Sequence, residues 1–205
     1  MVLVPSRQAV IRIWCQVSLI FLLIFLAGVS YAQTAIGGEG NFNLYWPDRT
    51  YLWHYNPANK PEWLGEEEAL KLVQDAVAGW GDCGVNLIYS GLTDTPPGSI
   101  DGVNVIGWKL DGKKYSAWTT WAAHRDGRAI EADVTLYTNI FNQYLGTGID
   151  ARLELNKSII HEVGHVLGLS HSDRPEDAMS VKIRTRPEWQ LPSDNDISRC
   201  RTRYP

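Results

Sequence analysis

The segment from His161 to His171 constrains the fold more than any other feature, because it spaces three histidines four and six residues apart. Residues four apart on an α-helix are neighbours on one face, with Cβ atoms about 5–6 Å apart. A helix therefore brings His161 and His165 together. His171 cannot join them on a continuing helix, since six residues advance about 9 Å along the axis. Gly168 follows His165 by three residues, where a left-handed glycine would end the helix and turn the chain back.

Zinc binding is the chemistry that suits this arrangement. Zinc takes imidazole nitrogens at about 2.0–2.1 Å, and a catalytic site keeps its fourth position for water. We expect His161, His165 and His171 to hold one Zn²⁺ ion, and Glu162, which points off the ligand face, to act as general base toward the activated water. This extended spacing is a metalloprotease signature, which a later methionine turn accompanies. A chance match on an ordinary amphipathic helix is the alternative.

The first 32 residues differ in composition from the rest. Two arginines and a largely apolar stretch, residues 17–29, precede the small residues of a signal-peptidase site that ends at Ala32. We predict a signal peptide over residues 1–32; an uncleaved membrane anchor is the alternative. Either one exports the remainder, as a secreted protein or into a periplasm. No later stretch is long and apolar enough to span a bilayer, so we expect no membrane association after cleavage.

The remaining chain is acidic. Cleavage removes two of the 19 basic residues and none of the 23 acidic residues, which leaves a net charge of −6. Nucleic-acid binding needs a basic face, so this composition argues against such a partner. We expect residues 33–45, a short glycine-rich stretch, to be a flexible N-terminal segment. Residues 46–205 are long enough for one domain with its own core.

Two cysteines remain once Cys15 leaves with the signal peptide. Cys83 and Cys200 permit one intramolecular disulfide, which an oxidising compartment favours. A loop of this length would stabilise the fold by up to roughly 4–5 kcal/mol in the chain-entropy model. Two unpaired buried thiols are the alternative.

The hydrophobic pattern predicts an α+β fold, with a sheet backed by helices. Apolar residues at spacings of three and four predict a helix over residues 66–80, and two further helices are expected over residues 153–167 and 194–204. Runs of aromatic and β-branched residues between proline and glycine turns predict five strands, at residues 46–55, 85–89, 102–108, 115–123 and 130–137.

With these features the sequence resembles the matrixins, the matrix-metalloproteinase group of the metzincin clan, and especially their compact bacterial-type members. The resemblance covers most of residues 44–205. It implies a twisted, mainly parallel sheet with an antiparallel edge strand, an active-site helix and a C-terminal helix. It also places Met179 in the methionine turn, as an apolar floor beneath the zinc, although a plain core methionine is the alternative. The segments that carry it include Ser170-His171-Ser172, Ala178-Met179-Ser180 and residues 191–197.

The resemblance further implies a zinc-dependent endopeptidase that acts on protein or peptide substrates. Residues 115–122 would then form the sheet edge above the cleft, where a peptide adds as an extra strand. An interior or turn-capping strand is the alternative for this segment. The residues expected along the substrate edge are Tyr115, Ala117, Trp118 and Thr119.

The sequence departs from the family's pattern in three ways. No cysteine lies between Ala32 and the first predicted strand, so we expect no thiol-based latency, and a separate protein inhibitor is one remaining way to restrain activity. Only His54 and His124 lie outside the trio, so we predict a single zinc ion, and we expect His124 to be a turn residue. The sequence has no compact acidic loop of the kind that binds calcium, so calcium binding is left open. Residues 181–183 replace the usual wall of the specificity pocket, so side-chain preference is not transferred.

A secreted binding module that keeps the fold and the zinc is the alternative function. The nine tryptophans favour it, because tryptophan often anchors interfaces. Glu162 favours the enzyme, since a retired enzyme has no need of a general base. We therefore predict a secreted, monomeric zinc metalloendopeptidase.

Overall fold

The computed structural model describes residues 33–35, 44–112, 114–180 and 191–205. Three of the sequence predictions lie outside these residues and are not tested by the fold. They concern the signal peptide at residues 1–32, the glycine-rich stretch at residues 36–43, and the departure from the family's pattern at residues 181–183.

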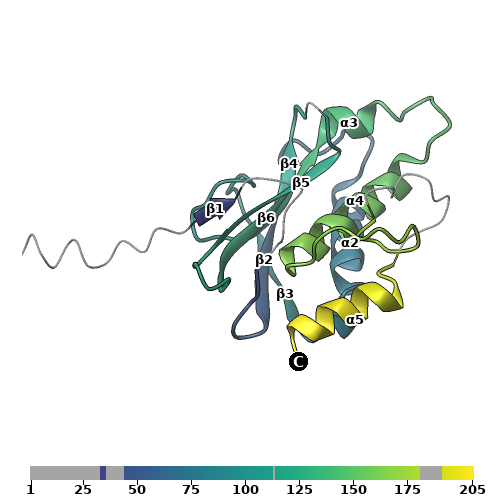
Figure 1. Cartoon of the computed structure of the whole chain (residues 1–205). Coiled ribbons are helices and arrows are strands. Elements are labelled where there is room, and N and C mark those ends of the chain that lie inside the picture. Colours follow the sequence, from purple (N-terminus) through teal and green to yellow (C-terminus); the bar gives the residue numbers. More distant parts are fainter. Residues whose placement is uncertain (1–32, 36–43, 113, 181–190) are drawn as a thin grey trace, which may run out of the picture. The chain divides into compact units, whose positions relative to one another are not determined.

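A six-stranded mixed sheet is the framework of the fold (Figure 1). Its strands follow the order β1-β5-β6-β4-β2-β3. The parallel part consists of β2 (Thr50–Asn56), β3 (Asn86–Leu92), β4 (Val105–Lys109) and β6 (Ala129–Tyr137). The next strand, β5 (Ala117–Ala123), is antiparallel to β6. This arrangement confirms the predicted fold class, a mainly parallel sheet with an antiparallel strand toward one edge.

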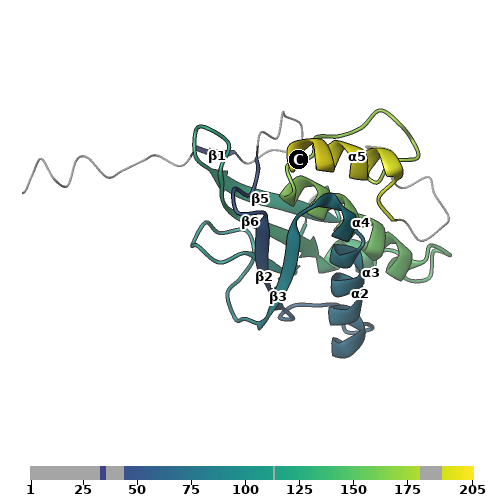
Figure 2. The ribbon, with the colours of Figure 1, turned by 90° about the horizontal axis from the view of Figure 1, so that it is seen from below.

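Three long helices lie on one side of the sheet (Figures 1 and 2). They are α2 (Glu66–Ala78), α4 (Ala151–Val166) and α5 (Asp194–Arg203). A short helix that the sequence did not predict, α3 (Thr138–Asn142), directly follows β6. Among the residues that the structure describes, no helix is long and apolar enough to cross a bilayer.

The core between the sheet and the helices is rich in aromatic side chains. Trp46, Trp53, Trp80 and Trp108 are all buried there. Trp80, just after α2, donates a hydrogen bond from Nε1 to the carbonyl oxygen of Ile160 at 3.0 Å, which ties α2 to α4. These four tryptophans therefore stabilise the fold and are not available as interface anchors.

The described residues at the two ends of the N-terminal segment, which was predicted to be flexible over residues 33–45, pair with other parts of the chain. Gln33–Ala35 forms strand β1, which pairs antiparallel with β5 so that Ala35 lies opposite Trp121. Leu44 is fully buried, and Tyr45 makes a parallel bridge to Arg128. The prediction rested on local glycine content, whereas the unpaired backbone groups along the edge of β5 supply the partner. β1 therefore covers part of the edge that the sequence analysis assigned to substrate.

Strand β2 begins later than predicted. The sequence suggested a strand from Trp46, but the chain turns before Thr50, and Arg49 adopts a left-handed φ of +53°. Aromatic residues before this turn gave the pattern its apparent length. Trp46 serves the core in another way, because its indole Nε1 donates to the carbonyl oxygen of Val166 at 3.0 Å.

Cys83 and Cys200 form the disulfide, with Cα atoms 5.3 Å apart. Cys83 ends the short 3₁₀ helix η1 (Gly81–Cys83), and Cys200 lies in α5. Both cysteines are fully buried. The bond therefore attaches the C-terminal helix to the segment that follows α2.

Candidate metal centre

Helix α4 carries the first two histidines, of which His165 is buried and His161 is partly buried. Asp150 caps its start by accepting hydrogen bonds from the backbone nitrogens of Arg152 and Leu153, at 2.9 and 3.2 Å. The helix is buried around most of its circumference, as expected for one enclosed by a sheet and other helices. Polar side chains in such a helix need partners, because an unsatisfied buried polar group costs about 1–3 kcal/mol. The partners of His161 and His165 are therefore informative.

Gly168 ends α4 in the way the sequence predicted. Its φ is +82°, in the left-handed region that glycine adopts at little cost. The backbone nitrogen of Gly168 donates to the carbonyl oxygen of His165 at 2.8 Å, and that of Leu169 donates to Gly164 at 2.9 Å. These two hydrogen bonds form a Schellman motif. The motif reverses the chain and brings His171 back toward α4.

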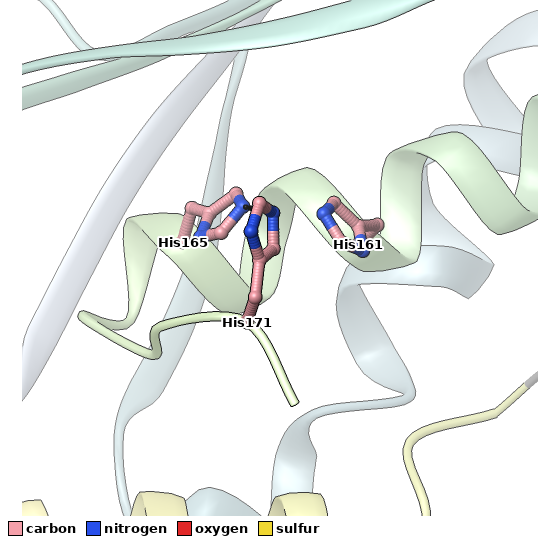
Figure 3. Close-up of side chains that lie close together, drawn as sticks. All are labelled: His161, His165 and His171. Carbon is pink, nitrogen blue, oxygen red and sulfur yellow. Dashed lines mark hydrogen bonds between the residues drawn. The ribbon is translucent and has the colours of Figure 1, made fainter. Parts of the chain in front are cut away.

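The three imidazoles converge on one point (Figure 3). Their candidate ligand nitrogens all lie within 4.8 Å of one another. The Nε2 atoms of His165 and His171 are 3.2 Å apart. Two nitrogens that bind one tetrahedral zinc ion at 2.0–2.1 Å lie about 3.3 Å apart. The pair of His165 and His171 therefore already has the separation that one tetrahedral zinc ion requires.

Hydrogen bonds orient two of the rings for metal binding. His161 Nδ1 lies 2.8 Å from the carbonyl oxygen of Ala178, and His165 Nδ1 lies 2.8 Å from that of Leu169. Since a carbonyl only accepts, Nδ1 carries the proton and Nε2 is left to face a metal. Burial lowers the pKa of both imidazoles, His165 the more strongly. Both rings are therefore kept in the neutral form that binds zinc.

Met179 lies directly against α4. It is fully buried, and a Cβ built on Gly164 would overlap its Sδ atom and come within 2.9 Å of Trp80 Cζ2. Because residue 164 is glycine, the methionine segment (Ala178–Ser180) can approach the helix between the two histidines. The preceding residue, Ala178, supplies the carbonyl that orients His161.

A buried polar network, which the sequence did not predict, holds the methionine segment in place. Asp196 of α5 accepts a hydrogen bond at 2.6 Å from the backbone nitrogen of Ala178. Asp177 is fully buried, which disfavours its charged form, but donors around it outweigh burial and lower its pKa. The one sequence signal was a capping box at the start of α5. The donors to Asp177 are Ser172, Ser193 and Asn195.

Glu162 lies between the two helical histidines in sequence and is 9% exposed. Its Oε2 accepts a hydrogen bond from Thr119 Oγ1 at 2.6 Å. Burial raises the pKa of Glu162 to about 7, although the bonds from Thr119 act in the opposite direction. A carboxyl group with this pKa can accept and release a proton near neutral pH, as a general base requires.

The four residues predicted along the substrate edge occupy different environments. Tyr115 precedes β5 and is 45% exposed, with its ring 5.2 Å from that of Trp118. Ala117 and Thr119 are buried, and Thr119 contacts Glu162 of α4. The side chain of Thr119 therefore faces the core, and only its backbone can meet a peptide added to the sheet edge.

The histidines outside the trio lie elsewhere. His124 follows β5, and its carbonyl oxygen accepts from the backbone nitrogen of Gly127 at 2.9 Å, which agrees with the predicted turn. His54 lies in β2, paired with Val105 of β4. In the described part of the chain, the trio of His161, His165 and His171 is the only cluster of three or more potential metal ligands.

A mixed sheet, a helix with two histidines, a glycine turn and a third histidine together define a metzincin-type metallopeptidase fold. The matrixin family profile matches residues 46–204, so the chain belongs to the matrixin family of zinc-dependent peptidases. Among solved structures, a chain in the GM1-bound form of the ECX AB5 holotoxin is similar, with a TM-score of 0.53 and 14% sequence identity. That match covers 83% of this chain and 87% of the other, and it supports the fold alone. No curated protein matches the sequence.

Proposed function

We propose that this protein is a secreted zinc endopeptidase, in which His161, His165 and His171 hold one Zn²⁺ ion and Glu162 is the general base. One observation carries the proposal. Three imidazoles converge within 4.8 Å, two of them with Nδ1 bonded to carbonyl oxygens, beside a buried carboxyl group whose pKa is about 7. This combination provides both a metal site and a base.

The protein's own groups divide the work of hydrolysis. When bound, zinc supplies a Lewis acid for the attacking water and the scissile carbonyl. Glu162 takes a proton from that water and delivers it to the nitrogen of the leaving amine. Burial of the carboxyl group keeps its proton affinity high enough to accept the proton, and still low enough to release it.

Protein or peptide substrates would pair with β5 through their backbone. β1 pairs with Trp121–Ala123, so we expect substrate to pair with the part of β5 between Ala117 and Thr120. Tyr115 and Trp118 lie together at this end and are at least partly exposed, so they would contact substrate side chains.

Export is part of the proposal. The predicted signal peptide, residues 1–32, would be removed, and residues 46–205 would form the catalytic domain. The disulfide between Cys83 and Cys200 supports an oxidising destination, outside the cell or in a periplasm.

Comparison of residues 33–205 with a Glu162→Gln variant tests the function. Both proteins are prepared with the disulfide formed, and bound zinc and casein cleavage are measured. We expect one zinc ion in each, with cleavage reduced roughly 10²- to 10⁴-fold in the variant and abolished by a chelator in the parent. Zinc without cleavage in both proteins would favour a binding module. Absence of zinc from both folded proteins would refute the assignment of the three histidines.

A further inference from the structure

Thr119 connects the sheet to the candidate base. It lies in the middle of β5, opposite Val134 of β6, and is 5% exposed. Its hydroxyl oxygen is 2.6 Å from Glu162 Oε2 and 3.1 Å from the backbone oxygen of Glu162. Both oxygens accept, so the hydroxyl of Thr119 is the donor and shares its single hydrogen between them. The hydrogen bond to an ionised carboxylate is the stronger of the two.

A pair of hydroxyl groups makes a second contact between this strand and the same helix. Ser116 Oγ, just before β5, lies 2.9 Å from Ser158 Oγ of α4. Ser158 donates its proton to the carbonyl oxygen of Glu154 at 2.8 Å, which leaves Ser116 to donate to Ser158. Ser158 and Glu162 are one helical turn apart. Two contacts one turn apart prevent β5 from sliding along α4.

A glutamate side chain has three rotatable bonds, so burial of its stem does not by itself orient the carboxylate. We propose that Thr119 is a positioning residue, which holds Glu162 Oε2 and thereby directs the other carboxylate oxygen toward the reacting water. This inference rests on the proposed role of Glu162 as general base. It gives Thr119 a role through its inward-facing hydroxyl, in addition to the backbone contacts expected of an edge strand.

The contact also sets a distance between two parts of the reaction. A peptide that pairs with β5 is placed by the backbone of this strand, and the base is held by a side chain of the same strand. The same strand residue, Thr119, would therefore help to fix both positions: that of the scissile bond through the strand backbone, and that of the base through its side chain. A misplacement of about 1 Å costs roughly 10²-fold in rate when groups must be aligned. Loss of one hydroxyl should accordingly change turnover and not substrate binding.

The test compares steady-state kinetics of zinc-loaded variants on one quenched peptide. Thr119→Val keeps the shape and removes the hydroxyl, and we expect kcat to fall about 10- to 100-fold with KM changed by less than about twofold. Thr119→Ser restores the donor and should recover most of the activity. Thr135→Val is the matched control, since Thr135 is buried on the neighbouring strand β6, outside the edge expected to pair with substrate, so parent activity is expected. Thr119→Ala replaces the valine variant if that protein does not fold.

Two further measurements separate positioning from a general structural role. In a Glu162→Gln background, Thr119→Val should cause no further loss of kcat. In the zinc-free proteins, a double-mutant cycle on the unfolding equilibrium should give a coupling of about tenfold or more between Thr119 and Glu162, and none between Thr135 and Glu162. Zinc content is measured in every variant, so that metal loss is not mistaken for misalignment.

The outcomes are distinct. If Thr119→Val matches the parent while Glu162→Gln is inactive, the positioning role is refuted and the proposed function stands. An equal loss of kcat in both backgrounds would also refute it, because Thr119 would then act independently of Glu162. If Glu162→Gln retains full activity, the proposed function itself fails. A rise in KM with unchanged kcat would assign Thr119 to substrate binding instead.

Discussion

Substitution of Gly168 by alanine tests how His171 is brought back to the helix. The residue has a φ of +82°, which costs an L-residue roughly 1–2 kcal/mol. An added Cβ would also overlap the carbonyl oxygen of Leu44, and would lie 3.0 Å from its carbonyl carbon and 3.1 Å from Arg203 Cδ. Two of these three atoms are backbone, so the clash cannot be relieved by a side-chain rotation. Overpacking of this kind costs about 1–3 kcal/mol, for a total near 2–5 kcal/mol.

Gly148→Ala is the matched control. Gly148 has a φ of +81°, but nothing lies within 4 Å of the position its Cβ would occupy. It therefore carries the conformational cost without the clash. The difference between the two variants isolates the contact with Leu44, and we expect Gly168→Ala to cost about 1–3 kcal/mol more.

Urea unfolding of the zinc-free proteins measures both costs, and competition with a chelator measures zinc affinity. Movement of the turn displaces His171, so Gly168→Ala should also weaken zinc binding, whereas Gly148→Ala should not. Equal destabilisation by the two substitutions, with equal zinc affinity, would refute the reasoning, because it would show that the turn relaxes around the new methyl group without disturbing the third histidine.

Two further predictions concern stability away from the histidines. Replacement of both Cys83 and Cys200 by alanine should lower the free energy of unfolding by about 3–5 kcal/mol, since the bond spans 117 residues of sequence; a urea midpoint equal to that of the parent would contradict this. Asp133 is 1% exposed, and burial raises its pKa to about 7 although the backbone nitrogens of Gly98 and Val105 donate to it. Since the unfolded pKa is near 4, the folded protein binds more protons between these values, and this group makes stability fall as pH rises from about 4 to 7. The stability of the parent relative to Asp133→Asn should therefore drop by about 1–3 kcal/mol between pH 5 and pH 8 in unfolding titrations, and a difference independent of pH would exclude the shifted carboxyl group.

The parts of the fold that the sequence predicted are those set by local spacing. Periodicity located α2 and α4 to within a few residues, and the spacing of His161, His165 and Gly168 predicted a helix that ends in a left-handed turn. The limited choice of partners allowed the pairing of Cys83 with Cys200 to be predicted. In each case the prediction depends on residue spacing within one helix, or on the small number of cysteines available for pairing.

The parts that could not be predicted depend on contacts between distant segments. The hydrogen bond from Thr119 to Glu162 joins residues 43 apart, and no property of either residue in the sequence indicates that they meet. The pairing of β1 with β5 depends on a free sheet edge, which exists only after the sheet has formed. Asp196 had a visible role as part of a helix cap, but its second role, toward Ala178, depends on how α5 packs against the methionine segment.

The attachment of α5 has a consequence for the order in which the protein is made. The orientation of His161 depends on the carbonyl oxygen of Ala178, the backbone nitrogen of Ala178 donates to Asp196, and the same helix is anchored through Cys200 to Cys83. Translation delivers all three histidines before it delivers α5. A nascent chain at that stage carries every proposed ligand but lacks the segment that fixes the first of them. The orientation of His161 is therefore completed by a helix that is synthesised after all three histidines, and that helix is held by a bond that an oxidising compartment favours.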